Sequence, residues 1–240
     1  MKKHYNVKIK SFLCKMIRFI YPSFKYLQKS YSQDGEDLVL KAIMNKRYTH
    51  NGFYVDVGAH HPFRFSNTAI FYKKGWKGIN IEPTPNLITA FNKYRKRDIN
   101  LNVGIAEKEG ELTFYEFDEP ALNSFNKDLS VDRNNNTSYN IISQKQIKVF
   151  TLEQILDKYM NKNQNIDFIT IDVEGLDLSV LSSNNWEKYR PNYVLVEAEI
   201  NFEEPQRNEI YAFLSSRSYE LIGKTLRTLI FRDQTLICNN

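Results

Sequence analysis

Three acidic residues each stand at the end of a short hydrophobic stretch, and together they could form one ligand site. Asp56 closes an aromatic and β-branched run, Glu82 follows the run 79–81, and Asp172 ends the run 166–172. Such runs favour buried strands. In an open α/β sheet, ligands bind beyond the carboxyl ends of the strands. We therefore expect these carboxylates at one edge of a sheet.

The residues around Asp56 predict a strand, a tight turn and then a helix. Asp56-Val57-Gly58-Ala59 ends the strand, and a polar run with a helix-start signal follows. A glycine lets the backbone pass close to a ligand where a side chain would block it. We expect Asp56 and Gly58 to border the ligand.

Each acidic residue has more than one chemical interpretation. Glu82 could accept hydrogen bonds from both hydroxyls of a ribose, or it could cap the helix that begins at Thr84. Asp172 and Glu174 are close enough in sequence for one to raise the pKa of the other and create a general base. They would equally bind a divalent cation that orients vicinal hydroxyls. The structural alternative is that Glu174 caps the next helix and Asp172 only orders the loop.

Two histidines follow the first turn. A histidine near neutral pH is a natural general base, and His61 falls where an acceptor would enter, although single histidines are more often structural hydrogen-bonding groups. His4 and His50 have no such context. The four histidines show no zinc-ligand spacing, so we predict no zinc site and name no metal ligands.

Strand and helix patterns alternate along the chain. The alternation predicts an α/β fold with a mostly parallel sheet covered by helices on both faces. The expected strands are 53–57, 79–82, about 99–105, 111–117, 166–172, 193–197, about 219–223 and about 227–238. The expected helices begin near Asp34, at Ser66 or Asn67, at Thr84-Pro85, at a Thr151 capping box, and near 176 and 205.

The middle of the chain is harder to assign. Residues 111–117 alternate and predict an extra strand that pairs with the third strand as a hairpin. Residues 118–145 lack periodicity, and Asn134-Asn135-Asn136 is polar and expected to be mobile. A loop this long is usually a lid, a binding loop or disordered. We expect a lid over the acceptor.

Five ordered segments together resemble the FkbM family of class I S-adenosylmethionine (SAM)-dependent methyltransferases. They are Ser32-Gln33-Asp34-Gly35-Glu36-Asp37, Gly52-Phe53-Tyr54-Val55-Asp56-Val57-Gly58-Ala59-His60, Gly78-Ile79-Asn80-Ile81-Glu82-Pro83, Leu101-Asn102-Val103-Gly104 and Ile169-Thr170-Ile171-Asp172-Val173-Glu174-Gly175. Members of this family mostly O-methylate sugars and sugar-like natural products. The resemblance runs from about Tyr31 to Glu199. It departs at His60-His61-Pro62, where many members have Asn and a second glycine.

The resemblance implies a Rossmann-like class I methyltransferase fold with a seven-stranded sheet, and SAM as the cofactor. It places the ribose at Glu82, an upstream contact at Gln33 and the adenine at the end of the third strand. The expected cofactor-binding residues are Gln33, Asp56, Gly58, His60, Glu82, Pro83, Gly104, Ile105 and Asp172. The expected catalytic residues are Asp172, His61 and Glu174, and the expected acceptor-binding residues are His61, Asn123, Ser124, Glu197 and Glu199.

The charge is unevenly distributed. Of the 33 basic residues, eight lie in residues 1–30, which contain no acidic residue. The other 210 residues carry 25 basic and 28 acidic side chains, which argues against a nucleic-acid partner. The two cysteines, Cys14 and Cys238, form no framework, and no apolar run suits a signal peptide or a membrane span. We expect a cytoplasmic protein.

Residues 1–30 are expected to be a segment separate from a methyltransferase domain at 31–240. Phe12, Met16, Phe19 and Ile20 fall on one stripe of a basic amphipathic helix. Such a helix would lie on an anionic membrane surface, pack on the domain, or contact a partner subunit in a homo-oligomer.

The sequence predicts an O-methyltransferase that acts on a sugar or nucleotide-activated sugar in capsular or other surface-polysaccharide biosynthesis. One alternative is an NAD(P)-dependent Rossmann oxidoreductase, which is disfavoured because the first turn lacks G-x-G-x-x-G. The other is an inactive binding protein that retains the methyltransferase fold.

Overall fold

The structure is a computed structural model that describes residues 21, 23, 26–45, 48, 51–198 and 205–236. The chain divides into two compact units, Met1–Ser30 and Tyr31–Asn240. The helix expected over 11–20 and the acceptor candidate Glu199 lie outside the described residues. Within the described part, no helix combines the length and apolar character needed to cross a membrane.

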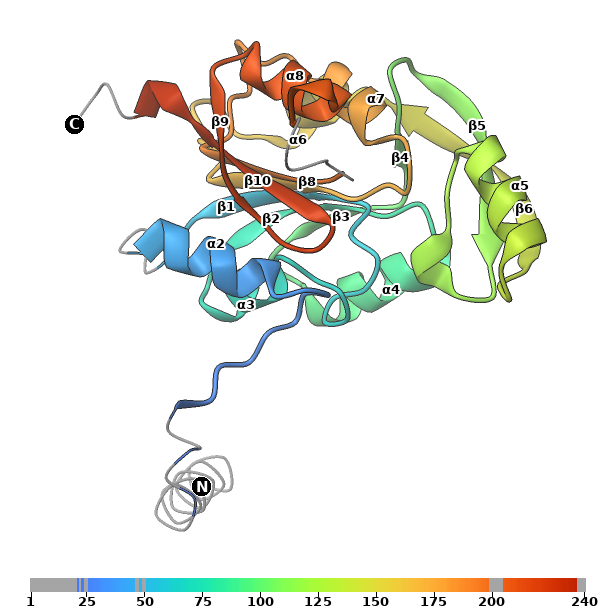
Figure 1. Cartoon of the computed structure of the whole chain (residues 1–240), viewed down its shortest axis with the longest axis horizontal. Coiled ribbons are helices and arrows are strands. Elements are labelled where there is room, and N and C mark those ends of the chain that lie inside the picture. Colours follow the sequence, from blue (N-terminus) through green and yellow to red (C-terminus); the bar gives the residue numbers. More distant parts are fainter. Residues whose placement is uncertain are drawn as a thin grey trace. The chain divides into compact units, whose positions relative to one another are not determined.

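The second unit is built on a seven-stranded sheet with the order β3-β2-β1-β7-β8-β10-β9 (Figure 1). The first five strands in this order are parallel, whereas β10 is antiparallel to both of its neighbours. This mostly parallel arrangement confirms the predicted class I methyltransferase fold. The strands are β1 (Phe53–Val57), β2 (Lys77–Ile81), β3 (Ile99–Leu101), β7 (Phe168–Ile171), β8 (Tyr193–Glu197), β9 (Tyr219–Lys224) and β10 (Thr228–Asp233).

Helices cover both faces of this sheet. Figure 1 shows α2 (Glu36–Met44), α3 (Ala69–Lys73) and α4 (Pro85–Tyr94) on one side. On the other side are α6 (Leu152–Tyr159), α7 (Asp177–Ser182) and α8 (Glu209–Ser215).

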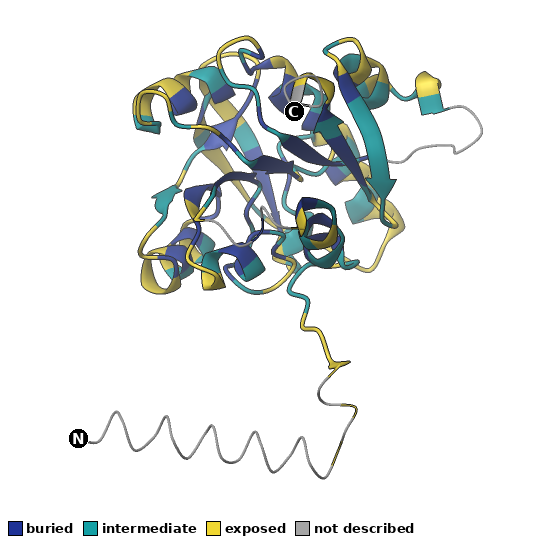
Figure 2. Cartoon of the chain, turned by 90° about the vertical axis from the view of Figure 1, so that its left-hand side faces the viewer, coloured by how far each residue is buried: buried dark blue, intermediate teal, exposed yellow. Residues whose placement is uncertain are grey.

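Alternation along β1 explains how one strand serves both layers. Val55 and Val57 pack into the cluster that includes α6, α7 and α8, while Tyr54 packs with residues of α2 and α3. The buried residues concentrate in the strands and on the inner helix faces (Figure 2).

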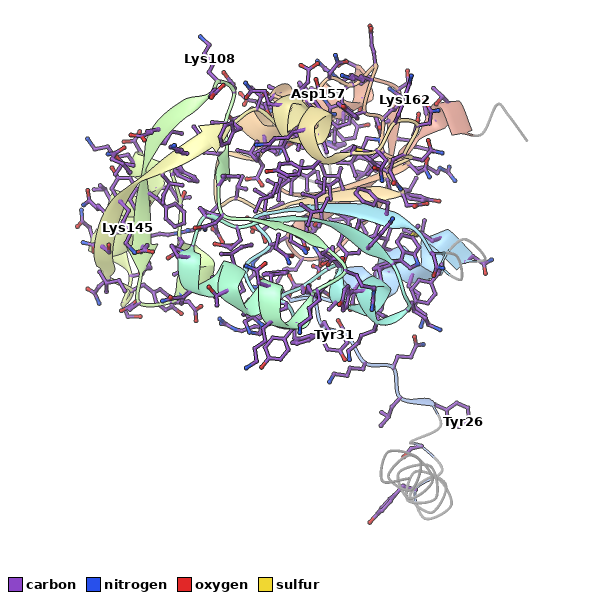
Figure 3. The ribbon with its side chains drawn as sticks, turned by 180° about the vertical axis from the view of Figure 1, so that it is seen from behind. Tyr26, Tyr31, Lys108, Lys145, Asp157 and Lys162 are labelled. Atoms are coloured by element: carbon purple, nitrogen blue, oxygen red, sulfur yellow. The ribbon has the colours of Figure 1, made fainter. Side chains whose placement is uncertain are left out.

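A second, three-stranded sheet adjoins this core, and its residues Ile105 and Phe150 pack with the core residues. It has the order β4-β6-β5, with β4 (Gly104–Ile105), β5 (Gly110–Phe117) and β6 (Ile141–Phe150). Between β5 and β6 the chain forms a 3-10 turn, η3 (Pro120–Leu122), and helix α5 (Lys127–Asn136). Lys145 on β6, which is labelled in Figure 3, pairs with Glu116 on β5 at 2.6 Å between Nζ and Oε2.

This small sheet corrects three predictions. The expected third strand 99–105 divides between the two sheets, and 111–117 pairs with β6 rather than with the third strand. The segment 118–145, expected to lack regular structure, contains a helix and the start of a strand. Helix α5 buries only Ser130, and its N-terminus is capped by Asn126, whose side chain accepts from the Leu129 N–H at 3.1 Å. It therefore has no apolar stripe by which periodicity could identify it.

Local signals were more reliable at the helix starts. Thr151 and Gln154 form the predicted capping box of α6. Pro85 is the first residue of α4, and Thr84 is its N-cap residue, although without a side-chain capping bond. The predicted caps Ser66 and Asn67 are wrong, because α3 begins after Thr68.

Candidate functional site

A cavity of about 380 Å³ lies at the carboxyl ends of the central strands of the seven-stranded sheet. The residues after β1, β2 and β7 and the end of β8 form its walls, and the segment 119–125 of the small sheet closes one side. Its size falls within the usual range for small-molecule sites. The sequence-predicted residues on its wall are Gln33, Gly58, His60, Glu82, Pro83, Gly104, Ile105, Asn123, Ser124, Asp172, Glu174 and Glu197.

Glu82 is the buried acid of this cavity. Its Oε2 accepts the backbone N–H of His60 at 2.8 Å, and its Oε1 accepts that of Thr84 at 2.7 Å. Burial raises the pKa of Glu82 to about 7, despite these hydrogen bonds. A carboxylate has about four acceptor positions, so acceptor capacity remains for a hydroxyl group in the cavity. Because Thr84 is the N-cap residue of α4, the hydrogen bond from its N–H means that Glu82 also helps to cap this helix, which was the alternative role.

Gly58 has a left-handed backbone, with φ of +76°. A Cβ at this position would overlap the backbone carbonyl of Asp172. The close approach that requires a glycine is therefore made by the protein's own chain, and it brings the turn after β1 against the end of β7. Gly104 is similarly confined, since a Cβ there would lie 2.5 Å from the Phe125 ring.

The segment 31–37 is ordered by its own polar side chains. The Asp37 carboxylate accepts the Tyr31 N–H at 2.8 Å and the Ser32 hydroxyl at 2.9 Å. Glu36 accepts the Asp34 N–H at 2.9 Å and the Thr225 hydroxyl at 2.7 Å. These contacts hold Gln33 on the cavity wall.

Asp56 is not part of the cavity wall, contrary to the prediction. Its side chain projects from the other face of β1 and accepts the Thr68 hydroxyl at 2.6 Å. Burial raises its pKa to about 6, opposed by the Thr68 hydrogen bond and by the charge of Arg95. The carboxylate therefore stabilises the turn without facing the cavity.

We call the polar group around Asp56 the arginine network, comprising Tyr54, Asp56, Thr68, Arg95 and Asp98. Arg95 is fully buried and donates to the Tyr54 hydroxyl at 2.9 Å and to the Thr68 hydroxyl at 3.2 Å. Arg95 also donates to the Pro62 carbonyl at 3.0 Å and to the Ser66 hydroxyl at 3.0 Å. The network thus fixes the loop between β1 and α3.

The two motif histidines have different positions. His60 lines the cavity, and burial, followed by the charge of Arg64, lowers its pKa to about 4. His61 does not line the cavity, because its Nδ1 accepts the backbone N–H groups of Phe63 and Arg64, both at 3.1 Å. Burial also lowers the pKa of His61. The structure thus places His61 in a turn and does not support its predicted catalytic and acceptor-binding roles.

Asp172, Glu174 and Glu197 form what we call the acid cluster, with carboxylate oxygens within 4.8 Å of one another. Asp172 is open to the cavity, yet the surrounding protein and the charges of Glu197 and Glu174 raise its pKa well above the usual value. The pKa of Glu197 is raised by burial and by Glu174. Carboxylates this close share protons, so the cluster can take up a proton. The spacing also suits the divalent cation considered as an alternative.

The loop that carries Glu174 is held from two sides. Asp177 accepts the N–H groups of Val173 and Gly175, both at 3.2 Å, and burial raises its pKa to about 7. Glu174 forms an ion pair with Arg133 of α5 at 2.5 Å. It does not cap α7, so the structural alternative is wrong for Glu174.

Asn123 and Ser124 line the cavity but make hydrogen bonds within the protein. Asn123 accepts the Phe117 N–H at 2.7 Å and donates to the Thr84 hydroxyl at 3.2 Å. Ser124 donates to the Glu174 carbonyl at 2.8 Å. These bonds tie the small sheet to α4 and to the acid cluster.

Sequence reasoning missed the arginines of the site. Arg64 and Glu119 form a two-bond ion pair at 2.8 and 2.9 Å between the loop after β1 and the small sheet. Arg133 and Arg227 also reach the cavity wall. No local signal could have identified them, since each lies in a turn or in a helix without an apolar face.

The cavity residues fit the expected SAM. Glu82 retains acceptor capacity for a ribose hydroxyl, and the Gln33 amide can both donate to and accept from an amino-acid group. Val103, Ile105 and Phe114 supply an apolar wall for a planar base. The wall carries five acidic and three basic side chains, which suits a cationic sulfonium.

Comparison with known families gives an independent result. The family model described as "Methyltransferase FkbM domain" matches residues 56–221. No curated protein matches the chain.

Several solved structures are similar to the chain. The methyltransferase FkbM from Methylobacillus flagellatus KT is 17% identical, with a TM-score of 0.46 over 76% of this chain and 43% of its own. The chain thus spans less than half of that protein's length. A TehB-like SAM-dependent methyltransferase from Corynebacterium glutamicum is 9% identical, with a TM-score of 0.41 over 92% of this chain and 98% of its own. An O-methyltransferase from Bacillus cereus in complex with S-adenosylhomocysteine (SAH) is 9% identical, with a TM-score of 0.40 over 91% and 88%.

Proposed function

The chain belongs to the FkbM family of SAM-dependent methyltransferases, and from this premise we propose that it methylates a hydroxyl group of a sugar or nucleotide-activated sugar. We place this reaction in surface-polysaccharide biosynthesis. The observation that carries the proposal is the acid cluster on the wall of the cavity that also contains Glu82.

Transfer to a hydroxyl requires a group that removes a proton. Asp172 suits this role because its raised pKa makes it a stronger base than an ordinary aspartate. Glu197 lies beside it and can share the proton. A neutral amine already carries the lone pair that attacks, whereas a sugar hydroxyl becomes a good nucleophile only as its proton is removed, so the cluster favours an oxygen nucleophile.

The other residues bind and orient. Bound SAM supplies a methyl group on a sulfonium, which needs no further activation. Glu82 would hold the ribose of the cofactor, Gln33 would hold its amino-acid end, and Glu174 would orient the acceptor hydroxyl. Correct positioning of the reacting groups can lower the barrier by several kcal/mol.

The family assignment argues against the alternative of an NAD(P)-dependent oxidoreductase, because the cofactor of this family is SAM. The second candidate is an inactive binding protein. One observation favours it: His61 and Asp56, two of the predicted site residues, do not line the cavity. The retained acid cluster favours an enzyme.

The test is a screen of nucleotide-linked sugars with methyl-labelled SAM, in which mass spectrometry identifies the product. We expect one labelled methyl on a sugar hydroxyl, and no product from Asp172→Asn. Labelling on nitrogen would refute O-methylation. Binding of SAM by calorimetry with no transfer to any sugar would favour the inactive protein, and Glu82→Ala should weaken SAM binding in either case.

A further inference from the structure

A second cavity, of about 620 Å³, adjoins the first. Its walls come from α5, the loop after β7, the start of α7, the end of β8, the 3-10 turn η4 (Pro205–Arg207), the start of α8 and the turn between β9 and β10. It contains none of the residues that we assign to SAM, since Gln33, Gly58, Glu82 and Ile105 line only the first cavity.

The two cavities share one wall. Arg133, Glu174, Glu197 and Arg227 line both of them, whereas Asp172 lines only the first. A molecule in the second cavity would therefore contact the carboxylates of Glu174 and Glu197 directly. Its reactive hydroxyl would have to pass this shared wall to reach Asp172.

Three arginines and four carboxylates, those of Glu174, Asp177, Glu197 and Glu209, line the second cavity. Arg133 comes from α5, Arg207 from η4 and Arg227 from the β9–β10 turn, so three distant parts of the chain each contribute an arginine to the wall of one cavity. Arginine presents five N–H donors in a planar fork that matches phosphate oxygens. Phosphate esters are the ligands for which such a group is best suited.

The existing ion pairs leave donors for a ligand. Arg133 uses one nitrogen for Glu174 and the other terminal nitrogen for the Leu122 carbonyl at 3.3 Å. Arg227 donates from Nη1 to Asp34 at 3.1 Å, and its side chain is 46% exposed. Further N–H groups on both side chains can meet an anion without breaking these pairs.

The rest of the wall suits a sugar derivative. Leu129, Leu178 and Ile210 provide apolar surface on which a ring can lie, and Asn208 is polar. Glu174 and Glu197 stand at the shared wall, where sugar hydroxyls would find acceptors. Within one acceptor, the carboxylates would thus bind the sugar hydroxyls and the arginines would bind the phosphate.

From this arrangement we propose that the second cavity binds a phosphorylated acceptor, with the phosphate ester on Arg133, Arg207 and Arg227 and a sugar hydroxyl directed through the shared wall. The inference rests on the proposed function and specifies its substrate class. Sugar phosphates and nucleoside diphosphate sugars share this chemistry.

Binding can be measured before the acceptor is known. The full chain is saturated with SAH to fill the first cavity, and uridine diphosphate, glucose 1-phosphate and pyrophosphate are titrated by calorimetry. We expect at least one of them to bind, and Arg207→Ala to weaken it about tenfold, as the loss of a charge-assisted hydrogen bond predicts. Arg207→Lys should retain part of the affinity.

Arg97→Ala is the matched control, because it removes the same charge from a side chain that contacts Tyr72 and lines neither cavity. It should bind the probe as the wild type does. SAH affinity should be unchanged in all variants, which shows that they fold. Failure of all three probes to bind, or equal affinity in Arg207→Ala and wild type, would overturn the inference.

Turnover separates this inference from the proposed function. With a phosphorylated acceptor, Arg207→Ala should raise KM about tenfold and leave kcat nearly unchanged. Equal kcat/KM for the phosphorylated and the unphosphorylated sugar would refute the phosphate site while leaving O-methylation intact. Absence of any hydroxyl methylation would refute the proposed function itself.

Discussion

The arginine network and the acid cluster are two groups of carboxylates at neighbouring strand ends, and they are organised in opposite ways. In the network, the fully buried Arg95 lies among Asp56, Asp98 and several hydroxyl groups, with 3.7 Å between its Nη1 and the nearest Asp98 oxygen. In the cluster, three carboxylates face one another, and the nearest cation, Arg133, lies at the edge with 22% of its side chain exposed.

The comparison shows that a carboxylate at the end of a strand is not by itself a functional group. Asp56 has its charge compensated and its Oδ2 hydrogen-bonded to Thr68, so it stabilises a loop. Asp172 has like charges around it and opens to a cavity. The neighbouring cation and the open space decide which carboxylate can do chemistry.

The largest difference between the acid cluster and the arginine network should be in the effect of their substitutions on kcat. Asp172→Asn is expected to lower kcat by about 10²–10⁴-fold, because a general base is lost. Stability should not fall, since the change removes repulsion within the acid cluster. In the wild type, kcat should rise with pH as Asp172 loses its proton, at a higher pH than for an ordinary aspartate.

Asp56→Asn is the matched change in the arginine network. It removes the same charge one strand away, and it should lower the unfolding temperature more than Asp172→Asn does. Steady-state kinetics and thermal unfolding of both variants measure the contrast. If Asp56→Asn lowered kcat as much as Asp172→Asn while remaining folded, the division between the two groups would be wrong.

Arg95→Met tests the structural side of the comparison. It leaves buried carboxylates without their cation, which typically costs about 3–5 kcal/mol of folding free energy. Urea unfolding measures the effect, with Arg97→Ala as an exposed control expected to change stability by less than about 0.5 kcal/mol. A loss below about 1 kcal/mol for Arg95→Met would show that the network contributes little.

A smaller effect should appear in the pH dependence of stability. The pKa values of Asp56, Glu82 and Asp177 are raised by burial to about 6, about 7 and about 7. Between about pH 4 and about pH 7, these three carboxyl groups therefore bind more protons in the folded protein than in the unfolded chain. Their contribution to the free energy of unfolding falls as the pH rises through this range, and it levels off above about pH 7.

Glu82→Gln should reduce that fall, because its side chain does not titrate. Urea unfolding at pH 5, 6, 7 and 8 compares it with Glu107→Gln, a substitution at an exposed position. Identical pH profiles for Glu82→Gln and wild type would mean that Glu82 is not the titrating group.

Much of the main fold was predictable because its signals are local. The strands 53–57 and 193–197 were predicted with the observed bounds, and the Thr151 capping box needs only four residues. The positions of Glu82 and Asp172 at strand ends followed from the same patterns. In these places the sequence and the tertiary structure agree.

The missed features depend on distant partners. Half of the ten residues of β6 are exposed and the strand is held by pairing with β5, and α5 has no apolar face. The orientation of Asp56 depends on Thr68 and Arg95, which no pattern around Asp56 reveals. The second cavity gathers residues from 129 to 227 and so could not be read from any single segment.

The pairing of β4 with β6 has one more consequence. Gly104 pairs with Val149 and Ile105 with Phe150, so the chain leaves for the small sheet and returns from it at the same place. Residues 106–148 therefore form an insertion whose two ends are already joined. A segment of different length could replace residues 106–148 without changing the strand order of the large sheet. Exchange of this segment during evolution is therefore a simple way to change the acceptor specificity.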